Sequence, residues 1–538
     1  MRVDLSRTRL PKALWVLWAG FFGIMLGYSV LVPLIRSPDE RLHTDLILAV
    51  EEGRYDWNPY DGVMTERGEE ANAALGSWIQ PKTVDNAVPR GQRPTLDELG
   101  GVEPGERANW QRQHPPLYYA VVGTVADVLT DDGQRIDRHV WLLRVLDAVL
   151  ASLLVPLGYL AAGAVTERTA LRVAAAASLA AIPQLAHIGA SVNNDNLANV
   201  LAAATLVVAL RIARYGASRR RLVAVGVVLG LTFLTKSVAV VLLPSVALAI
   251  AGRRRAGEPW RDVAEQVGLV GGVAFLVGGW WWLRNLVVHG TFLPSDYDPV
   301  LEPGAGPPPT FTWLRAFVDR VDRSFWGELG SLETEIPWWV AWPATVLVGV
   351  VVFAALQRPD VRRLVLVALA PMATALVLLL GMTWRGIAVD GRFPGLQGRY
   401  LFVGIVGLVV AVAATLDGLD ARWLRRAGWL LGGTILALHA AAVHAALQWF
   451  YGGPTLGLAD QLRGLLAWSP AGNAATVAVL AAGAIGVVAC AVVAVTACAG
   501  AAQRAASAEC QFHAEPMISS RPRDGSQPRV VRTSELSE

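Results

Sequence analysis

The sequence predicts an all-α polytopic membrane protein with about 12 transmembrane helices and a large polar loop after the first of them. The 538-residue chain is 54% hydrophobic, only 17% charged, and has a mean hydropathy of +0.41. It is therefore too apolar for a soluble protein of this length. Apolar runs of about 17 to 25 residues recur, which is the length an α-helix needs to cross roughly 30 Å of hydrocarbon. The alternating pattern of transmembrane β-strands is missing, so helices must satisfy the backbone hydrogen bonds.

Twelve segments have the composition of a transmembrane helix. In chain order they are 13–35, 139–163, 171–189, 196–212, 222–235, 237–251, 264–283, 337–357, 363–383, 400–417, 427–449 and 473–498. The first is too long for the core of a signal peptide and lacks a small-residue cleavage site, so we expect it to be retained. The apolar stretch from Leu117 to Leu129 is too short to span, and we expect a helix lying at the membrane interface.

The arginine clusters decide the orientation. If Leu117 to Leu129 does not cross, every cluster falls on the side of the basic N-terminus, as the positive-inside rule requires; if it crosses, every cluster faces outward. The clusters are 211–221, 253–255, 358–363 and 422–426. We therefore expect a multi-pass plasma-membrane protein with both termini in the cytoplasm. The main outer segments are then 36–138, 284–336 and 384–399, and we expect juxtamembrane helices joined by loops in the first.

This topology divides the chain into four parts. They are a cytoplasmic N-terminus (1–12), a transmembrane domain with outer loop 36–138 (13–450), an outer loop with the last transmembrane helix (451–500), and a cytoplasmic tail (501–538). The tail is rich in Ser, Arg, Pro, Gln and Glu and poor in aromatic residues, which is typical of disorder.

Several function classes lack support. The net charge is only +3 and the arginines form short clusters, so nucleic-acid binding is a poor explanation for them. The three cysteines form neither a disulfide framework nor a metal-binding spacing. Walker, HExxH and GxSxG motifs are not found, so NTP hydrolysis, zinc proteolysis and serine hydrolysis have no sequence support.

The first candidate site directly follows the first span, in Ser37-Pro38-Asp39-Glu40. With Ser37 as N-cap and Glu40 three residues later, a capping box explains Ser37, Pro38 and Glu40 as a helix start. It does not explain Asp39 and His43, which the i, i+4 spacing places on one helix face at the outer membrane surface. These two residues are the first candidates for function.

Further polar residues fall on the same predicted side. One of Asn194, Asp195 and Asn196 can cap the next helix, and the surplus suggests a polar site facing the compartment of Asp39. Snorkelling is the simpler explanation for Lys236 in its outer turn, and anchoring beside Trp280–Trp282 is the simpler one for Arg284. The remaining outer candidates are His114 before a proline pair, Glu328 in the stretch SFWGELG, and Arg399 with Tyr400 at the start of a span. Arg385 and Arg392 lie in the loop before Arg399, and outward arginines oppose the positive-inside rule, which favours anion binding by one of the three.

Taken in order, several short motifs resemble the GT-C superfamily of membrane glycosyltransferases. They are SPDERLH (37–43), HPPLYY (114–119), SVNNDNLAN (191–199), RNLVVHG (284–290), SFWGELG (324–330) and QGRYLF (397–402). The resemblance covers roughly residues 13–450 and is strongest to a bacterial branch catalogued as a membrane domain of unknown function.

The resemblance implies a GT-C-like fold and transfer of a sugar from a polyprenyl-phosphate donor to a cell-envelope acceptor on the outer face. Asp39 matches the acidic residue of the first outer loop, which would act as general base in an inverting reaction, with Glu40 helping or merely capping. His43, His114, Asn194, Asp195, Lys236, Arg284, Glu328, Arg399 and Tyr400 would then bind substrate, with Arg399 the first candidate for the lipid phosphate. The acceptor is a glycan, a lipid or a protein, and a divalent metal is left open.

Two other functions compete with this hypothesis. One is a transporter or flippase of a lipid-linked saccharide, which predicts charged residues within the spans and symmetric interrupted helices. The other is a non-enzymatic scaffold for envelope assembly, in which Asp39 would have no catalytic role.

Overall fold

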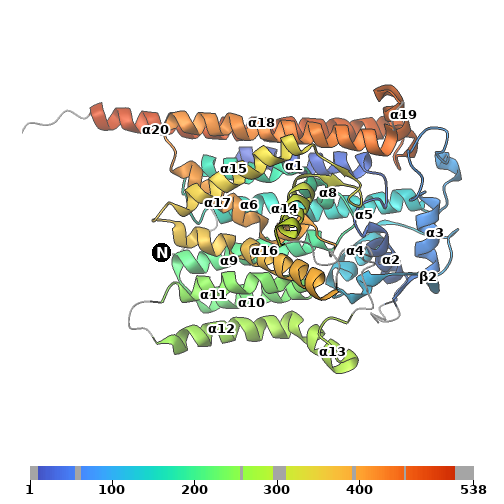
Figure 1. Ribbon diagram of the computed structural model, residues 1–538, viewed down its shortest axis with the longest axis horizontal. Coiled ribbons are helices and arrows are strands. Elements are labelled where there is room, and N and C mark those ends of the chain that lie inside the picture. The colour runs from blue at the N-terminus through green and yellow to red at the C-terminus, as the bar shows by residue number, and fades with distance from the viewer. Residues whose placement is uncertain are drawn as a thin grey trace, which may run out of the picture.

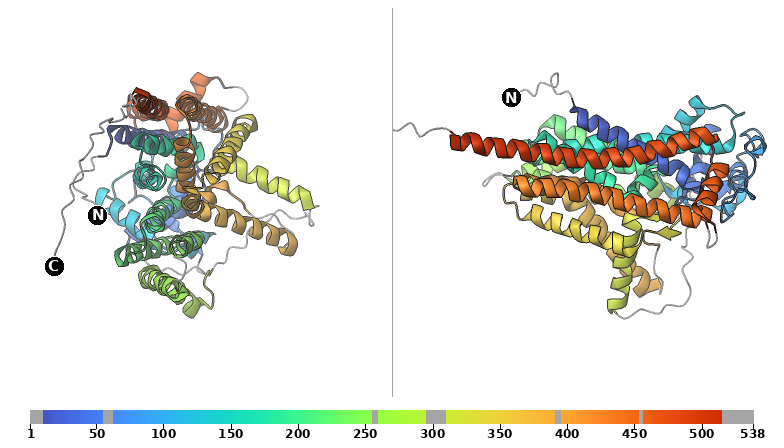
Figure 2. Two further views of the ribbon diagram at one scale, coloured as in Figure 1. Left: turned by 90° about the vertical axis from the view of Figure 1, so that its left-hand side faces the viewer. Right: turned by 90° about the horizontal axis from the view of Figure 1, so that it is seen from above.

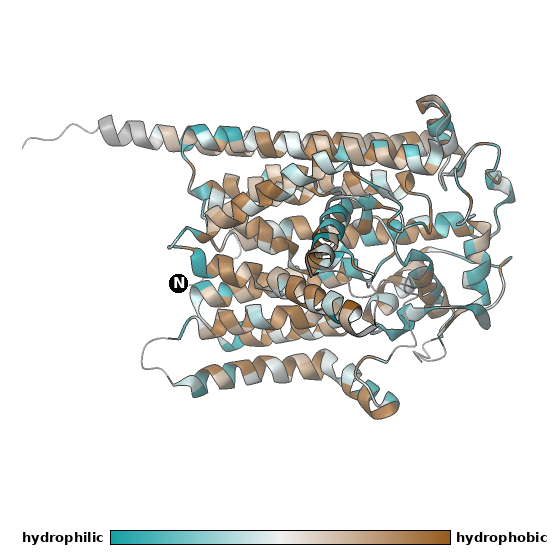
Figure 3. Ribbon diagram, in the orientation of Figure 1, coloured by the Kyte–Doolittle hydropathy of each residue, from teal (hydrophilic) through white to brown (hydrophobic). Residues whose placement is uncertain are grey.

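The computed structural model describes residues 10–54, 62–254, 259–294, 310–390, 395–452 and 456–514. It is a bundle of long, roughly parallel helices with polar elements gathered at one end (Figure 1). Hydrophobic residues dominate the middle of the bundle and hydrophilic residues concentrate at both ends (Figure 3). This distribution is what a bilayer imposes, because its hydrocarbon region accepts apolar side chains and excludes charged ones.

Within the described ranges, nine helices are long and apolar enough to cross a membrane, and a bent pair makes a tenth. The long helices are α1 (Lys12–Leu31), α5 (Ile136–Ser152) continued by α6 (Leu154–Ala162), α9 (Asp195–Tyr215), α12 (Trp260–Ala274) continued by α13 (Trp280–His289), α15 (Trp338–Leu356), α16 (Arg362–Asp390), α17 (Ile405–Asp417) preceded by the 3₁₀ helix η7 (Gly398–Gly404), α18 (Ala421–Ala446) and α20 (Asn473–Ala514). The fold is therefore an all-α membrane fold, as predicted, and the figure of twelve spans is approximate.

The difference from twelve concerns three predicted segments. Segment 171–189 is the bent pair, in which α7 (Thr169–Ala176) and η4 (Ala177–Ala181) meet α8 (Pro183–Gly189) at 77°. Pro183 stands at the first position of α8, where its missing N–H costs nothing. Segments 222–235 and 237–251 are the shorter elements α10 (Arg219–Phe233) and η5 (Ser237–Leu242) with α11 (Leu243–Ala251). These are helical where expected but do not reach the length of the other spans.

The first and last helices pack through small residues. A Cβ atom on Gly23 of α1 would lie 2.9 Å from the carbonyl oxygen of Ala482, and one on Gly27 would lie 3.1 Å from the Cα of Gly483 in α20. Glycine is thus required for the two backbones to approach this closely, as is common between membrane helices. Helix α20 continues to Ala514, so the predicted disordered tail is wrong for residues 501–514, while 515–538 lie outside the described residues.

The two ends of the bundle differ in charge. Arg214 at the end of α9 donates to the carbonyl of Ala164, Arg363 donates to the carbonyl of Ala213, and Arg358 donates to the carbonyl of Ala414. The arginine clusters therefore share one end, which the start of α1 also reaches, because Pro11 and Arg168 line the same pocket. Asp39, Asp195 and Arg399 meet at the opposite end. This grouping is the one predicted from the charges.

The polar end is built mainly from the first long loop. It contains α2 (Glu40–Glu51), β1 (Val63–Thr65), α3 (Glu66–Ala74), η2 (Arg90–Gln92), β2 (Pro104–Ala108), η3 (Trp110–Gln113) and α4 (Leu117–Leu129). Short helices joined by loops were expected here, whereas the antiparallel pairing of β1 with β2 was not. Helix α14 (Thr310–Trp326), the hairpin β3 (Glu328–Leu329) and β4 (Thr334–Glu335), and α19 (Leu458–Trp468) complete this end. Helix α14 stands out sideways from the bundle (Figure 2).

Candidate functional site

Four charged side chains form a continuous chain at the polar end. The Arg399 Nη2 atom lies 2.7 Å from Asp39 Oδ2, and Arg399 Nη1 lies 3.6 Å from Asp195 Oδ2. Asp195 Oδ1 accepts a hydrogen bond of 2.6 Å from Lys236 Nζ, which also donates to Asn194 Oδ1 at 3.0 Å. Two carboxylates and two cations thus alternate, so the formal charges balance.

Each member of this chain comes from a different element. Asp39 precedes α2, Asp195 is the first residue of α9, Lys236 lies between α10 and η5, and Arg399 lies in η7. The N-terminus of α9 favours a carboxylate at Asp195, because unpaired N–H groups give that end a partial positive charge. The sequence prediction that Asn194 and Asp195 face the site of Asp39 is correct in its geometry. Snorkelling of Lys236 is wrong, because its side chain is 12% exposed and paired.

Asp39 is the solvent-accessible end of this charge chain. Its side chain is 24% exposed, whereas that of Arg399 is 2% exposed. Its backbone has φ 60° and ψ 0°, the left-handed conformation that residues other than glycine adopt rarely. Strain of this kind is concentrated at functional sites, where the surrounding structure holds a side chain in a required direction. Here it aims a carboxylate at Arg399 while keeping one face open.

Several buried polar atoms around this chain lack a hydrogen-bond partner among the described residues. They are Arg399 Nε, Arg399 Nη1, Asn194 Nδ2 and Asp195 Oδ2. Three of these four are donors, and leaving a buried donor unpaired costs roughly 1–3 kcal/mol. Guanidinium and amide donors that converge in this way suit the oxygens of a phosphate or of a sugar. Tyr400 lies beside them, with its ring centroid 5.5 Å from Arg399 Cζ.

Glu40 has a different environment from its neighbour Asp39. Its carboxylate is fully buried and binds Arg144 of α5 twice, at 2.7 Å from Nε and 2.6 Å from Nη2. Arg144 also donates to the carbonyls of Ser29, Val32 and Pro33, which end α1. The pair therefore fixes the start of α2 against α1 and α5, and with it the position of Asp39.

The expected capping box is only half formed. The backbone N–H of Ser37 donates to Glu40 Oε2 at 3.3 Å, but Ser37 Oγ is buried without a partner among the described residues. The helix begins at Glu40 rather than at Pro38, since Asp39 is left-handed. The expectation that capping explains Glu40 is therefore wrong, because its main partner is Arg144.

His43 and His114 line the same region. His43 is buried and its Nδ1 lies 2.8 Å from the hydroxyl of Tyr119, whose ring stacks on the imidazole. Burial and then the charge of Lys236 hold the pKa values of both His43 and His114 well below the usual histidine value. Both rings are therefore neutral at neutral pH. Each can donate one hydrogen bond and accept another without placing a positive charge in the site.

We expect His43 to make folding sensitive to acid. Below about pH 6.5 an unfolded histidine takes up a proton while the buried His43 does not, so the free energy of unfolding falls by about 1.4 kcal/mol per pH unit from this group. The stability is complete above pH 6.5 and is lost as the pH falls. The measurement is the slope of unfolding free energy against pH for wild type and His43→Gln. His43→Gln should be flatter than wild type below pH 6.5, and His444→Gln, at an exposed site on α18, serves as the control. Equal slopes for wild type and His43→Gln would contradict the assignment.

Glu328 lies behind the site rather than in the charge chain. Arg320 of α14 is 2.9 Å from one carboxylate oxygen, while the other is buried and without a partner among the described residues. Burial raises the pKa of Glu328 despite Arg320. The same segment contacts η7, because Ser324 Oγ accepts a 2.7 Å hydrogen bond from the N–H of Gly398. The end of α14, which precedes Glu328, therefore supports the segment that carries Arg399.

Arg284 contacts its own helix. Its Nη1 lies 3.2 Å from Asn285 Oδ1 and 3.5 Å from a ring nitrogen of His289, and its guanidinium lies over the ring of Trp281. None of these residues belongs to the charge chain. The structure thus brings together Asp39, Asn194, Asp195, Lys236, Arg399 and Tyr400, with His43 and His114 beside them, whereas the contacts of Arg284 among the described residues are with its own helix.

Two buried charged residues under the site, Arg144 and Asp147, were not predicted. Asp147 of α5 accepts a 2.7 Å hydrogen bond from Tyr118 and a 2.9 Å hydrogen bond from Asn196, and Arg144 lies one turn before it. The available signal was an arginine and an aspartate three residues apart within an apolar run, since charged residues inside a span are functional or paired. The hydrogen bonds of Asp147 join α4, α5 and the first turn of α9.

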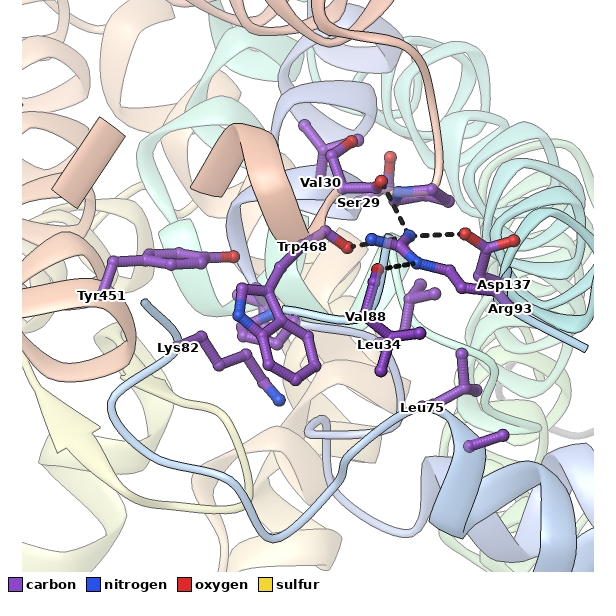
Figure 4. A pocket seen from close by; sticks show the side chains of 15 residues that line it. Ser29, Val30, Leu34, Leu75, Lys82, Val88, Arg93, Asp137, Tyr451 and Trp468 are labelled. Atoms are coloured by element: carbon purple, nitrogen blue, oxygen red, sulfur yellow. Dashed lines mark hydrogen bonds and ion pairs between the residues drawn. The ribbon is translucent and has the colours of Figure 1, made fainter. Parts of the chain in front are cut away.

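A small polar cavity beside the first loop contains no part of the charge chain. Its volume is about 30 Å³, enough for a water molecule. Arg93 fills one side, bonded to Asp137 and to the carbonyls of Val88 and Trp468, and Lys82 lies under the ring of Trp468 (Figure 4). These contacts fasten the first loop to the end of α19, which is a structural role.

The donor set does not fit a resident metal ion. In the described part of the chain, no group of three or more His, Cys, Asp or Glu side chains could hold one. Asp39 and Asp195 instead share Arg399. The arrangement is one of cationic donors, which bind anions without a metal.

Comparisons with known proteins give a family and two similar folds. Residues 22–409 match a family described as "Predicted membrane protein (DUF2142)". The fold is similar to two crystal structures of ArnT from Cupriavidus metallidurans. One, bound to undecaprenyl phosphate, has a TM-score of 0.45 at 16% identity and covers 92% of this chain and 77% of that one. The other, in the apo state, has a TM-score of 0.46 at 14% identity and covers 90% and 76%. No curated protein matches the sequence.

Proposed function

The chain belongs to the family described as "Predicted membrane protein (DUF2142)", and for this member we propose the function of a membrane glycosyltransferase. It transfers a sugar from a polyprenyl-phosphate donor to a cell-envelope acceptor on the outer face of the plasma membrane, with both termini in the cytoplasm. The observation that carries the proposal is the accessible carboxylate of Asp39 beside the buried, incompletely paired guanidinium of Arg399. Such a pair supplies the two functions that glycosyl transfer needs, a base and a site for the leaving phosphate.

The proposed reaction is a single inverting displacement. The acceptor hydroxyl gives its proton to Asp39 while its oxygen forms a bond to the anomeric carbon. The bond from that carbon to the phosphate oxygen breaks on the opposite side, so the configuration is inverted. The lipid phosphate leaves with the electron pair, and the N–H groups of Arg399 at Nε and Nη1 stabilise its negative charge, with Lys236 adding positive charge nearby.

The resting ion pair fits this reaction. Arg399 Nη2 lies 2.7 Å from Asp39 Oδ2, and this contact orients the carboxylate. The donor phosphate would accept hydrogen bonds from Arg399 Nε and Nη1, which have no hydrogen-bond partner among the described residues. Nη2 of the same guanidinium would stay bonded to Asp39. Glu40 is a positioning residue in this scheme, because Arg144 occupies its carboxylate.

The proposal is tested through Arg399. In Arg399→Gln, the KM for a polyprenyl-phosphate-sugar should rise by about tenfold or more, because a charge-assisted hydrogen bond contributes roughly 1.5–3 kcal/mol. Transfer of radiolabelled sugar by the purified protein in liposomes is the assay. Arg385→Gln, an exposed arginine in α16, is the matched control. An unchanged KM in Arg399→Gln would remove Arg399 from the donor site. Donor flipping without transfer would favour a transporter.

A further inference from the structure

Two arginines and two tryptophans gather near Asp39, whose charge acts on Arg41. Arg41 Cζ lies 5.4 Å from the ring centroid of Trp78 and 5.8 Å from that of Trp110. Arg107 Cζ lies 5.9 Å from the ring of Trp78. Arg41 is therefore held between two indole rings, and Trp78 has a guanidinium group from each of two arginines near it.

The two guanidinium groups repel each other, and no carboxylate in the described ranges is paired with either of them. Among the described residues, neither Arg41 nor Arg107 forms an ion pair. The pKa of Arg41 is lowered, first by burial and then by the positive charge of Arg107, while the negative charge of Asp39 acts in the opposite direction. Arg41 is therefore close enough to both residues to interact with them electrostatically. An anion between the two arginines would relieve their repulsion.

Polar contacts fix the backbone next to each tryptophan. The carbonyl of Ser77, next to Trp78, accepts a 2.5 Å hydrogen bond from Arg36 Nη1, and Arg36 is paired with Glu333. On the other side, Asn109 precedes Trp110.

Asn109 is fully buried, and its Nδ2 donates to the carbonyl of Leu42 at 3.0 Å and to Asp45 Oδ2 at 2.6 Å. Asp45 also binds Thr65, the last residue of β1. The backbone before Trp110 is thereby tied to the helix turn that carries Arg41. The two indole rings meet at Arg41, which lies within about 6 Å of both ring centroids.

Resting on the proposed function, we propose that Trp78, Trp110, Arg41 and Arg107 form the acceptor subsite and bind an anionic saccharide. A sugar ring presents an apolar face of C–H groups to an indole, and a carboxylate or phosphate on the sugar binds the guanidinium fork. Arg41 follows Asp39 by two residues. A saccharide bound there brings a hydroxyl to the base.

The surroundings favour a saccharide over a lipid surface. Strand β2, which carries Arg107, is almost entirely exposed and contains Glu106, and Glu66 and Glu70 are exposed on α3. A surface with so many carboxylates is repelled by anionic headgroups and does not enter the hydrocarbon. Elements α2, α3 and β2 lie together at the far polar end of the molecule (Figure 1).

Calorimetric titration of the purified full chain tests this subsite without any sugar donor. The probes are a hyaluronan hexasaccharide, which carries glucuronate, and maltohexaose, which is neutral. We expect the anionic probe to bind at least about tenfold more tightly, and Trp78→Ala and Arg107→Gln each to weaken its binding about tenfold. Both side chains are exposed, so folding should be retained. The control is Trp260→Ala, which removes an equally exposed indole that stacks on Arg254 at the opposite end of the molecule. This variant should bind the anionic hexasaccharide as tightly as the wild type does.

Two results would overturn the subsite. One is equal affinity for the two hexasaccharides. The other is that Trp78→Ala and Arg107→Gln lose binding to phosphatidylglycerol vesicles while their saccharide binding is unchanged. Because the titration contains no donor, saccharide binding without any sugar transfer would contradict only the glycosyltransferase proposal. Sugar transfer with saccharide binding unaffected by both substitutions would contradict only the subsite.

Discussion

Replacing Asp39 by Asn should slow sugar transfer by about 10²- to 10⁴-fold, which is the usual contribution of a general base. The amide has nearly the same size and accepts a hydrogen bond from Arg399, but it cannot take a proton from the acceptor hydroxyl. The loss should appear in kcat, because Arg399 and Lys236 remain to bind the donor phosphate. The measurement is the steady-state rate of transfer with the donor varied, for wild type and Asp39→Asn.

The fold should tolerate this substitution. Asp39 is partly exposed, and asparagine adopts the left-handed conformation at least as readily as aspartate. Asp460→Asn is a suitable control, because Asp460 is an ion-paired carboxylate on α19 at the same end of the molecule. A variant Asp39→Asn that retains more than about a tenth of the wild-type kcat would exclude Asp39 as the base.

The largest expected loss of stability follows from Arg144→Met. The substitution leaves the fully buried carboxylate of Glu40 without its cationic partner, and it removes the donors to three carbonyls at the end of α1. Breaking a buried ion pair from one side typically costs about 3–5 kcal/mol. The free energy of unfolding in mixed micelles should fall by that amount.

Two comparisons identify the cause. Arg168→Met removes a partly exposed arginine that lies 3.9 Å from Asp417 at the opposite end, and it should cost less than about 1 kcal/mol. Adding Glu40→Gln to Arg144→Met should restore part of the loss, because the buried charge is then gone. If Arg144→Met changes the free energy of unfolding by no more than Arg168→Met does, the pair does not hold the site in place.

The transmembrane helices were predictable because their length and composition are local properties of the sequence. Each of the twelve predicted segments is helical, and the family match confirms the branch that the motifs indicated. The number of full spans was less predictable. The bend at Pro183 and the break at Lys236 depend on how neighbouring helices pack, and a hydropathy window does not contain that information.

Which residues lie in the candidate site was largely predictable from the sequence. Which of them form ion pairs with one another was not. Asp39, Asp195 and Arg399 were grouped because the positive-inside rule puts them on one side, and they do meet. Arg144 and Glu40 are 104 positions apart, and an arginine within an apolar run does not reveal its partner. For the same reason Lys236 suggested snorkelling, since the carboxylate that holds it lies in another helix.

The central claim is that this chain transfers a sugar through Asp39. The most direct measurement places purified wild type and Asp39→Asn in sealed liposomes with a radiolabelled polyprenyl-phosphate-sugar and an acceptor panel. Product formation and donor translocation are followed in the same vesicles. We predict labelled product with wild type, and a rate at least about a hundredfold lower with Asp39→Asn. Translocation that is equal in both proteins, with no labelled product in either, would contradict the account.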